Sequence, residues 1–410
     1  MTLPNLQHRQ ARKETSKMAD TLRFEVSEYH ERLRKTKERM LREKVEVLIV
    51  SDPANMNYLT GYDGWSFYVH QGLVISLDYD EPIWFGRGMD ANGAKLTTWL
   101  SGDNIRPYED DYVQNVFKHP MSFVADIVRE KGWDRRHIGV EMDNYWFTGK
   151  CLETLVEELP QAEFQDATSL VNWVRIVKSA REIEYIRQAA RVCEHVMQTA
   201  VDSVEAGRLE SEAAANVYHA VVRGVGELTG DHPAIFPIMP TNERTSAAHL
   251  GWQPDRKYER GDLVLLELCG VRYRYHCPLS RTAYIGDPPK ELREIADAVV
   301  KGVEETLSFV RPGVTAEEVE ARWRQAISGT RVVKPSRLGY AFGLNYVPDW
   351  GEHTISLRSG DKTILMPGMT IHLMPGIWLD EFGFECSEPI LVTDGGCETL
   401  VSFPRRILMK

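Results

Sequence analysis

A single glutamate ends an apolar run in the second half of this 410-residue chain. Glu267 follows Leu263-Val-Leu-Leu, a pattern that predicts a fully buried strand. A buried carboxylate without a partner is destabilising, or it takes up a proton and becomes neutral. Arg281 or a backbone donor could satisfy this group, which would make Glu267 structural. The alternative, which we predict, is that Glu267 meets a cationic substrate or attacks it.

Four further segments resemble the motifs of a known superfamily. They are Ser280-Arg281-Thr282, Gly339-Tyr-Ala-Phe-Gly-Leu344, His372-Leu-Met-Pro-Gly376 and Ser387-Glu-Pro-Ile-Leu-Val-Thr393. Their order and spacing resemble the creatinase/aminopeptidase P superfamily, whose fold is called pita-bread. The resemblance implies an α/β N-terminal domain, creatinase-like and ribonuclease H-like, followed by an α+β pita-bread catalytic domain.

The resemblance also assigns five positions to the metal-ligand slots of that superfamily. These positions hold Glu267, Pro278, Tyr340, Met374 and Ser387. Hard divalent cations need several oxygen or imidazole ligands that converge on one point, and this set cannot supply them. We therefore predict a metal-free relative without a cofactor, in which the surviving acid handles an organic cation.

Two more residues are candidates for catalysis. His249 matches a superfamily histidine that faces the substrate and shuttles protons, and imidazole suits general acid–base work at cellular pH. Tyr340 stands between glycines that permit close backbone approach, and its phenol could donate a hydrogen bond or orient a water molecule. The alternatives are a surface loop position for His249 and a space-filling role for Tyr340.

Polar residues near these motifs are candidates for substrate binding. Glu352 and His353 are neighbours, so on a strand at most one of them can face a pocket. His372 shares a strand face with the residue in one vacated ligand slot, Met374.

The last strand offers two acids for the same role. By strand alternation Glu385 accompanies Ser387, and Glu388 points the other way. Pro389 could force a bulge that turns Glu388 inward. We include both acids as candidates and predict that Glu388 faces the pocket.

An aromatic segment in the first half of the chain is a candidate lid. Trp65 and Tyr68 belong to Gly64-Trp-Ser-Phe-Tyr68 and could stack on a flat cation, although an aromatic core strand is the simpler alternative. In dimeric members of the superfamily, a loop of this region reaches the active site of the partner. The resemblance therefore implies a homodimer.

Periodic patterns divide the chain into elements and domains. We expect a mobile extension over residues 1–25, the N-terminal domain over 26–176 and the catalytic domain over 177–410. The patterns predict helices over Phe24–Lys44, Met121–Lys131, Thr148–Glu158, Glu182–Val204 and Ser211–Leu228, strands over Val45–Val50, Gly72–Leu77 and Pro82–Gly86, and a turn at Asp52-Pro-Ala-Asn.

Composition narrows the function classes. The chain is 43% hydrophobic and 27% charged with a net charge of −11, which argues against nucleic acid as a partner. It lacks an apolar run of the roughly 20 residues needed to cross a bilayer, and its polar N-terminus does not suggest a signal peptide. The six cysteines show no Cys-x-x-Cys spacing and suggest reduced thiols in a cytoplasmic protein without membrane attachment.

The candidate residues together favour a small substrate that carries a delocalised cation and its own carboxylate. The cation already makes the central carbon electrophilic, so a metal Lewis acid is less necessary than for a neutral amide. Glu267, the Gly339–Leu344 turn and Ser387-Glu-Pro are similar to the ectoine-hydrolysing members of the superfamily. That resemblance implies opening of the cyclic amidine ring of ectoine to N-acetyl-2,4-diaminobutyrate, with Glu267 as nucleophile or base. A downstream deacetylase is a further partner in keeping with this product.

Three alternatives remain open from the sequence. The first is a creatinase-like amidinohydrolase that acts on another amidine or guanidine carboxylate. The second is a non-catalytic pita-bread module that binds a macromolecule through the emptied site, although His249 is retained. The third is a peptidase with an unusual metal site, which Pro278 and Met374 make improbable.

Overall fold

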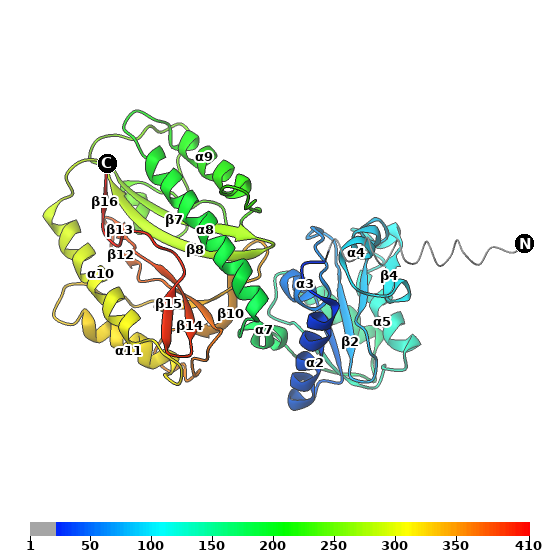
Figure 1. Cartoon of the computed structure of the whole chain (residues 1–410). Helices are drawn as coiled ribbons and strands as arrows, with labels where there is room; N and C mark the ends of the chain where they lie inside the picture. The colour runs from blue at the N-terminus through cyan, green and yellow to red at the C-terminus, as the bar shows by residue number, and fades with distance from the viewer. Residues whose placement is uncertain (1–21) are drawn as a thin grey trace, which may run out of the picture. The chain divides into compact units, whose positions relative to one another are not determined.

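The computed structural model describes residues 22–410 and shows two compact units that meet in the chain between Arg175 and Ile176 (Figure 1). The sequence-based expectation placed this boundary one residue further on. Most of the predicted N-terminal extension, residues 1–21, lies outside the described part of the chain.

The first unit is built on a six-stranded mixed sheet with the strand order β4-β3-β2-β1-β5-β6. Strand β1 pairs antiparallel with β2 and parallel with β5, so the sheet combines a meander with strand–helix–strand units. The elements are α2 (Val26–Glu43), β1 (Val47–Val50), α3 (Pro53–Thr60), β2 (Gly72–Ser76), β3 (Ile83–Arg87), α4 (Ala91–Thr97), β4 (Ile105–Tyr108), α5 (Pro120–Glu130), β5 (His137–Val140), α6 (Gly149–Glu158), β6 (Glu163–Asp166) and α7 (Leu170–Arg175).

Helix α3 begins where the sequence pattern predicted only a turn. The side chain of Asp52 accepts a hydrogen bond from the backbone N–H of Ala54 at 2.7 Å, and Pro53 occupies the first helical position. An acidic N-cap followed by proline starts a helix as readily as it makes a turn. Most of the following residues are buried, and this burial favours the helix over the turn. The helix ends at Gly61, which adopts the left-handed conformation (φ 86°).

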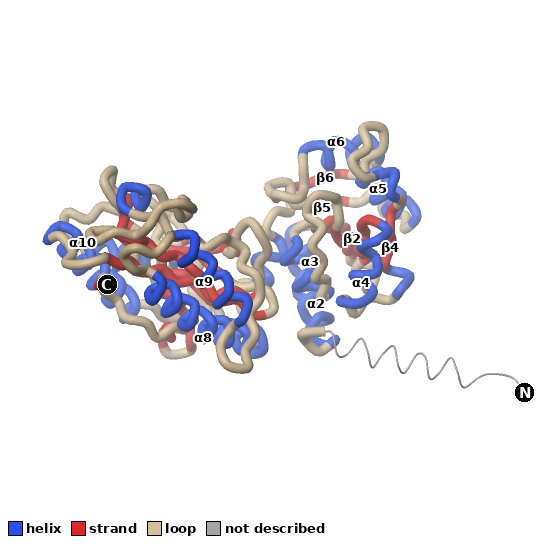
Figure 2. Tube along the Cα trace, turned by 90° about the horizontal axis from the view of Figure 1, so that it is seen from above, coloured by secondary structure: helices blue, strands red, loops and turns tan. Residues whose placement is uncertain are grey.

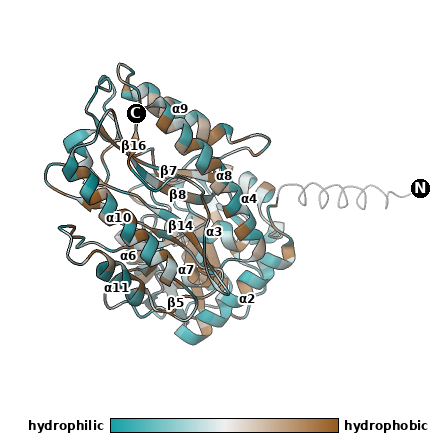
Figure 3. Cartoon of the chain, turned by 60° about the vertical axis from the view of Figure 1, so that its left-hand side comes forward, coloured by the Kyte–Doolittle hydropathy of each residue, from teal (hydrophilic) through white to brown (hydrophobic). Residues whose placement is uncertain are grey.

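The second unit contains a five-stranded sheet of order β10-β9-β11-β14-β15 and a three-stranded sheet of order β16-β8-β7. Helices α10 and α11 pack against each other, and hydrophilic residues, coloured teal, recur along both ribbons (Figure 3). The elements are α8 (Ala180–Ser203), α9 (Glu210–Arg223), the 3-10 turn η4 (Asn242–Ser246), β7 (Leu263–Arg272), β8 (Tyr275–Tyr284), α10 (Lys290–Phe309), α11 (Ala316–Ala326), β9 (Gly339–Phe342), β10 (Gly351–Ser356), β11 (Thr370–Leu373), β12 (Ile377–Trp378), β13 (Gly383–Phe384), β14 (Glu388–Thr393), β15 (Gly396–Thr399) and β16 (Leu408–Met409).

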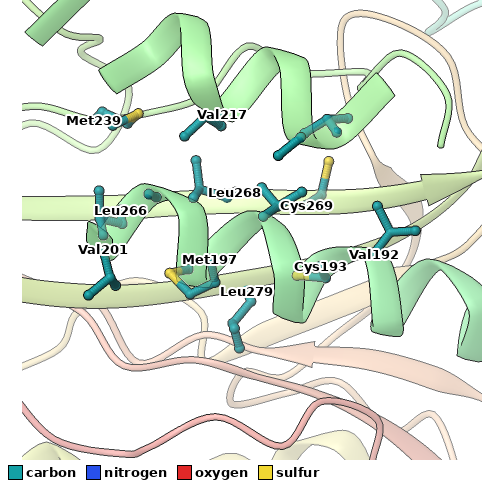
Figure 4. Packing of buried hydrophobic residues seen from close by; sticks show 14 of the residues in the cluster. Val192, Cys193, Met197, Val201, Val217, Met239, Leu266, Leu268, Cys269 and Leu279 are labelled. Carbon is teal, nitrogen blue, oxygen red and sulfur yellow. The ribbon is translucent and has the colours of Figure 1, made fainter. Parts of the chain in front are cut away.

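The core of the second unit lies between the hairpin β7–β8 and the helices α8 and α9, which run side by side (Figures 1 and 2). Val192, Met197 and Leu266 are among the buried apolar residues that fill this layer (Figure 4). Gly270 lets α8 approach closely, because a Cβ atom there would lie 2.0 Å from the carbonyl oxygen of Ala189. Strand β7 is therefore held rigidly by α8.

All six cysteines are free thiols, and five of them are buried. Within residues 22–410, no helix combines the length and the apolar character needed to cross a membrane.

Candidate functional site

Strands β7 and β8 place Glu267 directly opposite Ser280 in their antiparallel ladder, so both side chains share one face. Glu267 lies three residues before Gly270, and strand alternation therefore turns its side chain away from α8. Its side chain is almost wholly buried, with 5% exposure. No hydrogen bond or ion pair reaches its carboxylate from the described residues.

The segment before β14 brings a second acid to this face. The backbone N–H of Ser387 donates to the carbonyl of Ser280 at 3.1 Å, and the Thr282 hydroxyl donates to the carbonyl of Glu385 at 2.9 Å. Glu385 is fully buried, and both of its carboxylate oxygens lack a hydrogen-bond partner. The Ser280 hydroxyl makes no hydrogen bond of standard geometry, although it is near enough to offset part of the rise in the pKa of Glu385.

The two acids share one electrostatic environment. Burial raises the pKa of Glu385 to about 7, an effect that the positive charges of Lys334 and Arg281 partly oppose. Burial first, and then the charges of Glu385 and Asp349, hold the pKa of Glu267 well above its ordinary value. Two carboxyl groups that cannot both ionise retain a proton near neutral pH, as in other carboxylate pairs.

We expect Glu385→Gln to alter the pH dependence of stability. Folding raises the pKa of this carboxyl from 4.5 to about 7. Between these two pKa values the native state keeps a proton that the unfolded chain has lost. The stability that this proton contributes is fully present below pH 4.5 and is lost as the pH rises through about 7. The melting temperature of the variant minus that of wild type should therefore be larger at about pH 8 than at about pH 5.

The measurement is the melting temperature of wild type and variant at both pH values, with exposed Glu227 changed to Gln as the control. If the difference in melting temperature between wild type and Glu385→Gln is the same at both pH values, Glu385 does not change its protonation state in this range, which would contradict the prediction.

A chain of hydrogen bonds runs across β9, β11 and the segment before β14. Trp350 Nε1 donates to the Tyr340 hydroxyl at 2.8 Å, and this hydroxyl lies 3.1 Å from His372 Nδ1. His372 Nε2 lies 2.7 Å from the hydroxyl of Ser387, which accepts the backbone N–H of Ser280 at 2.7 Å. Tyr340 and Ser387, which the resemblance matches to two metal-ligand positions, are thus joined through His372.

Burial controls protonation along this chain. It lowers the pKa of His372 to about 3, so the imidazole is neutral and one ring nitrogen must accept a hydrogen bond. Burial and the charge of Glu267 also hold the pKa of Tyr340 well above its usual range. A neutral phenol beside Glu267 can donate a hydrogen bond either to His372 or toward a bound molecule.

Two cations lie beside the acids. The ammonium group of Lys334 donates to the carbonyl of Gly376 at 3.0 Å and to the Ser336 hydroxyl at 2.9 Å, and burial lowers its pKa to about 8. The guanidinium of Arg337 lies over the ring of Tyr340, 4.4 Å from the centroid. Among the described residues, no hydrogen bond or ion pair is made by that guanidinium.

The structure assigns Glu388 and Glu385 to different surroundings, the reverse of the preference drawn from the sequence. Glu388 Oε1 accepts hydrogen bonds from Arg281 at 2.7 Å and from Arg405 at 2.9 Å. Strand β14 pairs with β11 without a register shift at Pro389, so the bulge that would have turned Glu388 inward is absent from this pairing. Glu385, not Glu388, therefore accompanies Glu267, and Arg281 is engaged away from Glu267.

The remaining candidates are spread more widely. Glu352 forms a buried ion pair with Lys178 at 2.6 Å. His353 is exposed and lies 2.7 Å from Asp349 through Nε2. His249 is exposed in the turn after η4, and no described contact joins its imidazole to Glu267.

Trp65 belongs to the first unit. It is 52% exposed, and its ring packs against Phe67 with centroids 4.5 Å apart.

Four residues of the site were not identified from the sequence, namely Ser280, Lys334, Arg337 and Asp349. Hydrogen bonds from His353 and Gly351, against the effect of burial, hold the pKa of Asp349 below its ordinary value, so it remains ionised. Arg337 stands only three residues before Tyr340, and this proximity was the available signal.

The donor set of this site does not suit the metal ion that the resemblance to the superfamily suggests. Of the five ligand slots only Glu267 holds an acid, while Pro278 and Met374 contribute no oxygen or imidazole ligand. Among the described residues of the second unit, no three His, Cys, Asp or Glu side chains converge closely enough to hold an ion. The residues present therefore do not fit a divalent metal ion at this position.

Comparisons with known proteins identify the family of both units. Residues 32–177 match the creatinase/prolidase N-terminal domain, and residues 184–394 match metallopeptidase family M24. Ectoine hydrolase of Halomonas elongata is 43% identical over 95% of this chain and 99% of its own length. An uncharacterised hydrolase/peptidase of Sinorhizobium fredii is 41% identical over 95% and 99% of the two chains.

Solved structures agree at the level of fold. The dipeptidase PepE of Mycobacterium ulcerans superimposes with a TM-score of 0.78 at 22% identity, over 94% of this chain and 99% of that one. The predicted combination of an α/β N-terminal domain and a pita-bread domain is thus confirmed, and the chain belongs to metallopeptidase family M24, as a hydrolase homologue with a creatinase/prolidase N-terminal domain.

Proposed function

We propose that this protein hydrolyses ectoine to N-acetyl-2,4-diaminobutyrate without a metal ion. The observation that supports this most directly is the pair of buried acids, Glu267 and Glu385, which have no cationic partner within ion-pair distance among the described residues. A buried carboxylate pair is stabilised when a cation enters. The identity to an ectoine hydrolase, 43% over nearly the whole chain, favours a cyclic amidinium as that cation.

The reaction begins with a shift of the proton equilibrium. An amidinium beside Glu267 favours the ionised form of this acid, so the proton that the acid pair retains is held by Glu385 when the substrate is bound. The Glu267 carboxylate then attacks the ring carbon between the two nitrogens, which becomes tetrahedral and carries a new C–O bond. Confinement of the ring against a fixed carboxylate supplies the proximity that such an attack requires.

Ring opening needs a proton on the departing nitrogen. In our proposal Glu385 supplies it as the neutral acid, because its pKa of about 7 lets it act as donor and then as base at cellular pH. The C–N bond breaks, and water attacks the Glu267-linked carbon. One nitrogen then keeps the acetyl group, and Glu267 is released. The Tyr340 hydroxyl orients the ring or the water from the same wall.

In the alternative version of this reaction, Glu267 acts as a base on water and forms no bond to the substrate. Mass spectrometry of protein quenched during turnover separates the two versions. An adduct on the peptide that contains Glu267 supports direct attack, whereas full activity without the adduct supports the base mechanism.

We expect His249→Ala to reduce kcat less than Glu385→Gln does, because His249 is exposed. Loss of a general acid in the site costs about 10² to 10⁴ in rate, so Glu385→Gln should fall in that range. Steady-state kinetics with ectoine measure both variants. If His249→Ala lowers kcat more than Glu385→Gln does, His249 rather than Glu385 transfers the proton.

Arg337 is well placed to bind the carboxylate of the substrate, since its guanidinium packs on Tyr340 without an acidic partner in the described structure. A hydrogen bond to a charged group contributes about 1.5 to 3 kcal/mol. Arg337→Met should therefore raise KM for ectoine about 10- to 100-fold with little change in kcat, and Arg337→Lys should recover part of the loss. Unchanged KM in Arg337→Met would exclude this contact.

The proposed function is tested by incubating purified protein with ectoine, creatine and a proline dipeptide, with and without a chelator, and following the products by NMR. Ring opening of ectoine that survives the chelator supports the proposal. Turnover of creatine alone would indicate a guanidine substrate, and turnover of the dipeptide that the chelator abolishes would indicate a metallopeptidase. No turnover of any substrate would favour a binding module.

We further propose that the protein is a cytoplasmic homodimer in which Trp65 of one N-terminal unit reaches the partner's site. A deacetylase would then consume the acetylated product. Light scattering of the purified protein tests the dimer, and a monomeric protein with full activity would exclude a shared site.

A further inference from the structure

A second cluster of reactive side chains lies in the first unit. His70 precedes β2, His119 is the N-cap of α5, and Cys151 is in the first turn of α6. One ligand atom from each of the three residues lies within 4.8 Å of the others. Helices α5 and α6 pack against each other (Figure 2), so the cluster joins segments that are far apart in the sequence.

The spacing of this cluster is compatible with a site assembled around one metal ion. The Cys151 sulfur lies 3.6 Å from His70 Nδ1 and 3.8 Å from Nε2. With Zn–S bonds of about 2.3 Å and Zn–N bonds of about 2.0 to 2.1 Å, a tetrahedral site places sulfur about 3.6 Å from nitrogen. The imidazole rings of His70 and His119 have centroids 4.9 Å apart. The sulfur lies at similar distances from both nitrogens of His70, so this ring would turn to direct one of them at a shared ion.

Burial affects the protonation of all three side chains in the metal-free protein. Burial lowers the pKa of His70, and burial together with the charge of His70 lowers the pKa of His119 to about 4. Each neutral imidazole has one unprotonated nitrogen; in His119 this is Nδ1, which accepts the Met121 N–H, and the His70 ring bonds to the backbone of Trp146. Burial raises the pKa of the Cys151 thiol, which would lose its proton only when a metal binds.

A cavity of about 160 Å³ opens beside the histidines. His70 and His119 line it together with Tyr108, Gln114 and Asn115. Three protein ligands with an open fourth position are typical of zinc sites that keep water or a small ligand, and histidine with thiolate suits zinc better than magnesium or calcium.

We propose that His70, His119 and Cys151 bind one zinc ion, with the fourth coordination position open to this cavity. Two N–Zn bonds and one S–Zn bond form, and the Cys151 thiol proton leaves to solvent without a change in oxidation state. Ligation by His119 Nε2 would move the ring proton to Nδ1 and replace the 3.2 Å hydrogen bond from the Met121 N–H. The metal would hold the start of β2 and the first turns of α5 and α6 together. This site is independent of the chemistry at Glu267.

Cobalt(II) tests the proposal, because it occupies zinc sites and absorbs in the near ultraviolet when a thiolate binds it. The full-length protein is stripped with a chelator and titrated with Co²⁺, and metal content after Zn²⁺ loading is measured by mass spectrometry. We expect one equivalent and a thiolate band in wild type, in Cys397→Ser and in Glu267→Gln. Cys151→Ala should lose the band, and His70→Gln should weaken binding at least tenfold.

The controls distinguish this site from a metal bound elsewhere in the protein. Cys397→Ser removes a thiol that lies in the second unit, and Glu267→Gln shows whether the catalytic unit holds the metal instead. Circular dichroism confirms that each variant is folded. A wild-type protein without a thiolate band, or a Cys151→Ala variant that retains the full equivalent, overturns the proposal whether or not the variants fold.

Discussion

Replacement of Glu267 by glutamine should lower kcat/KM for ectoine by about 10² to 10⁴. Glutamine keeps the size and the buried position of the side chain, but its amide neither attacks the amidinium carbon nor accepts a proton from water. The same loss is expected whether Glu267 acts as nucleophile or as base, because both roles require the carboxylate. Steady-state kinetics with ectoine are the measurement.

The expected loss of activity should be accompanied by a gain in stability. Burial and the neighbouring acids make an ionised Glu267 unfavourable, and the amide removes that conflict. Glu398, which pairs with Arg187 at the surface, provides the control when changed to Gln. A Glu267→Gln enzyme with normal turnover would exclude both versions of the mechanism, and one with a lower melting temperature would mean that Glu267 has a structural partner.

Replacement of Glu388 by glutamine should strongly destabilise the protein, in contrast to the gain in stability expected for Glu267→Gln. Glu388 and Arg281 are both fully buried and paired at 2.7 Å, and Arg405 donates to the same oxygen at 2.9 Å. Removal of one partner of a buried ion pair leaves an uncompensated charge and costs about 3 to 5 kcal/mol. Thermal unfolding followed by circular dichroism should show a lower transition temperature for the second unit.

Glu385→Gln is the matched control for this result, since Glu385 lies three residues away and is equally buried. Its carboxylate has no hydrogen-bond partner, so near pH 8 the glutamine variant should be at least as stable as wild type. If Glu388→Gln and Glu385→Gln destabilise the protein equally, the two acids do not differ in the way that their contacts indicate.

The elements of this fold could be predicted well where the local pattern is strong. The predicted helix Glu182–Val204 corresponds to α8, Ala180–Ser203, because its apolar residues recur at helical spacing and Ser179 forms a capping box with Glu182. The predicted helix Ser211–Leu228 is shorter in the structure, where α9 ends at Arg223. Gly224, with φ at 69°, ends it, and a single glycine in a helical pattern is a weak signal by itself.

The sequence alone determined that Glu267 is a buried acid on an apolar strand, because this depends on residue types at neighbouring positions. The loss of donors from the metal-ligand positions is a prediction from the resemblance to the superfamily. Only the tertiary structure decided which acid accompanies Glu267, because hydrogen bonds between Thr282 and the backbone of Glu385 place Glu385 on that face, while Glu388 pairs with Arg281. Arg337, Lys334 and Asp349 likewise reach the site through the path of the chain between strands, and side-chain direction after a loop is not encoded in spacing.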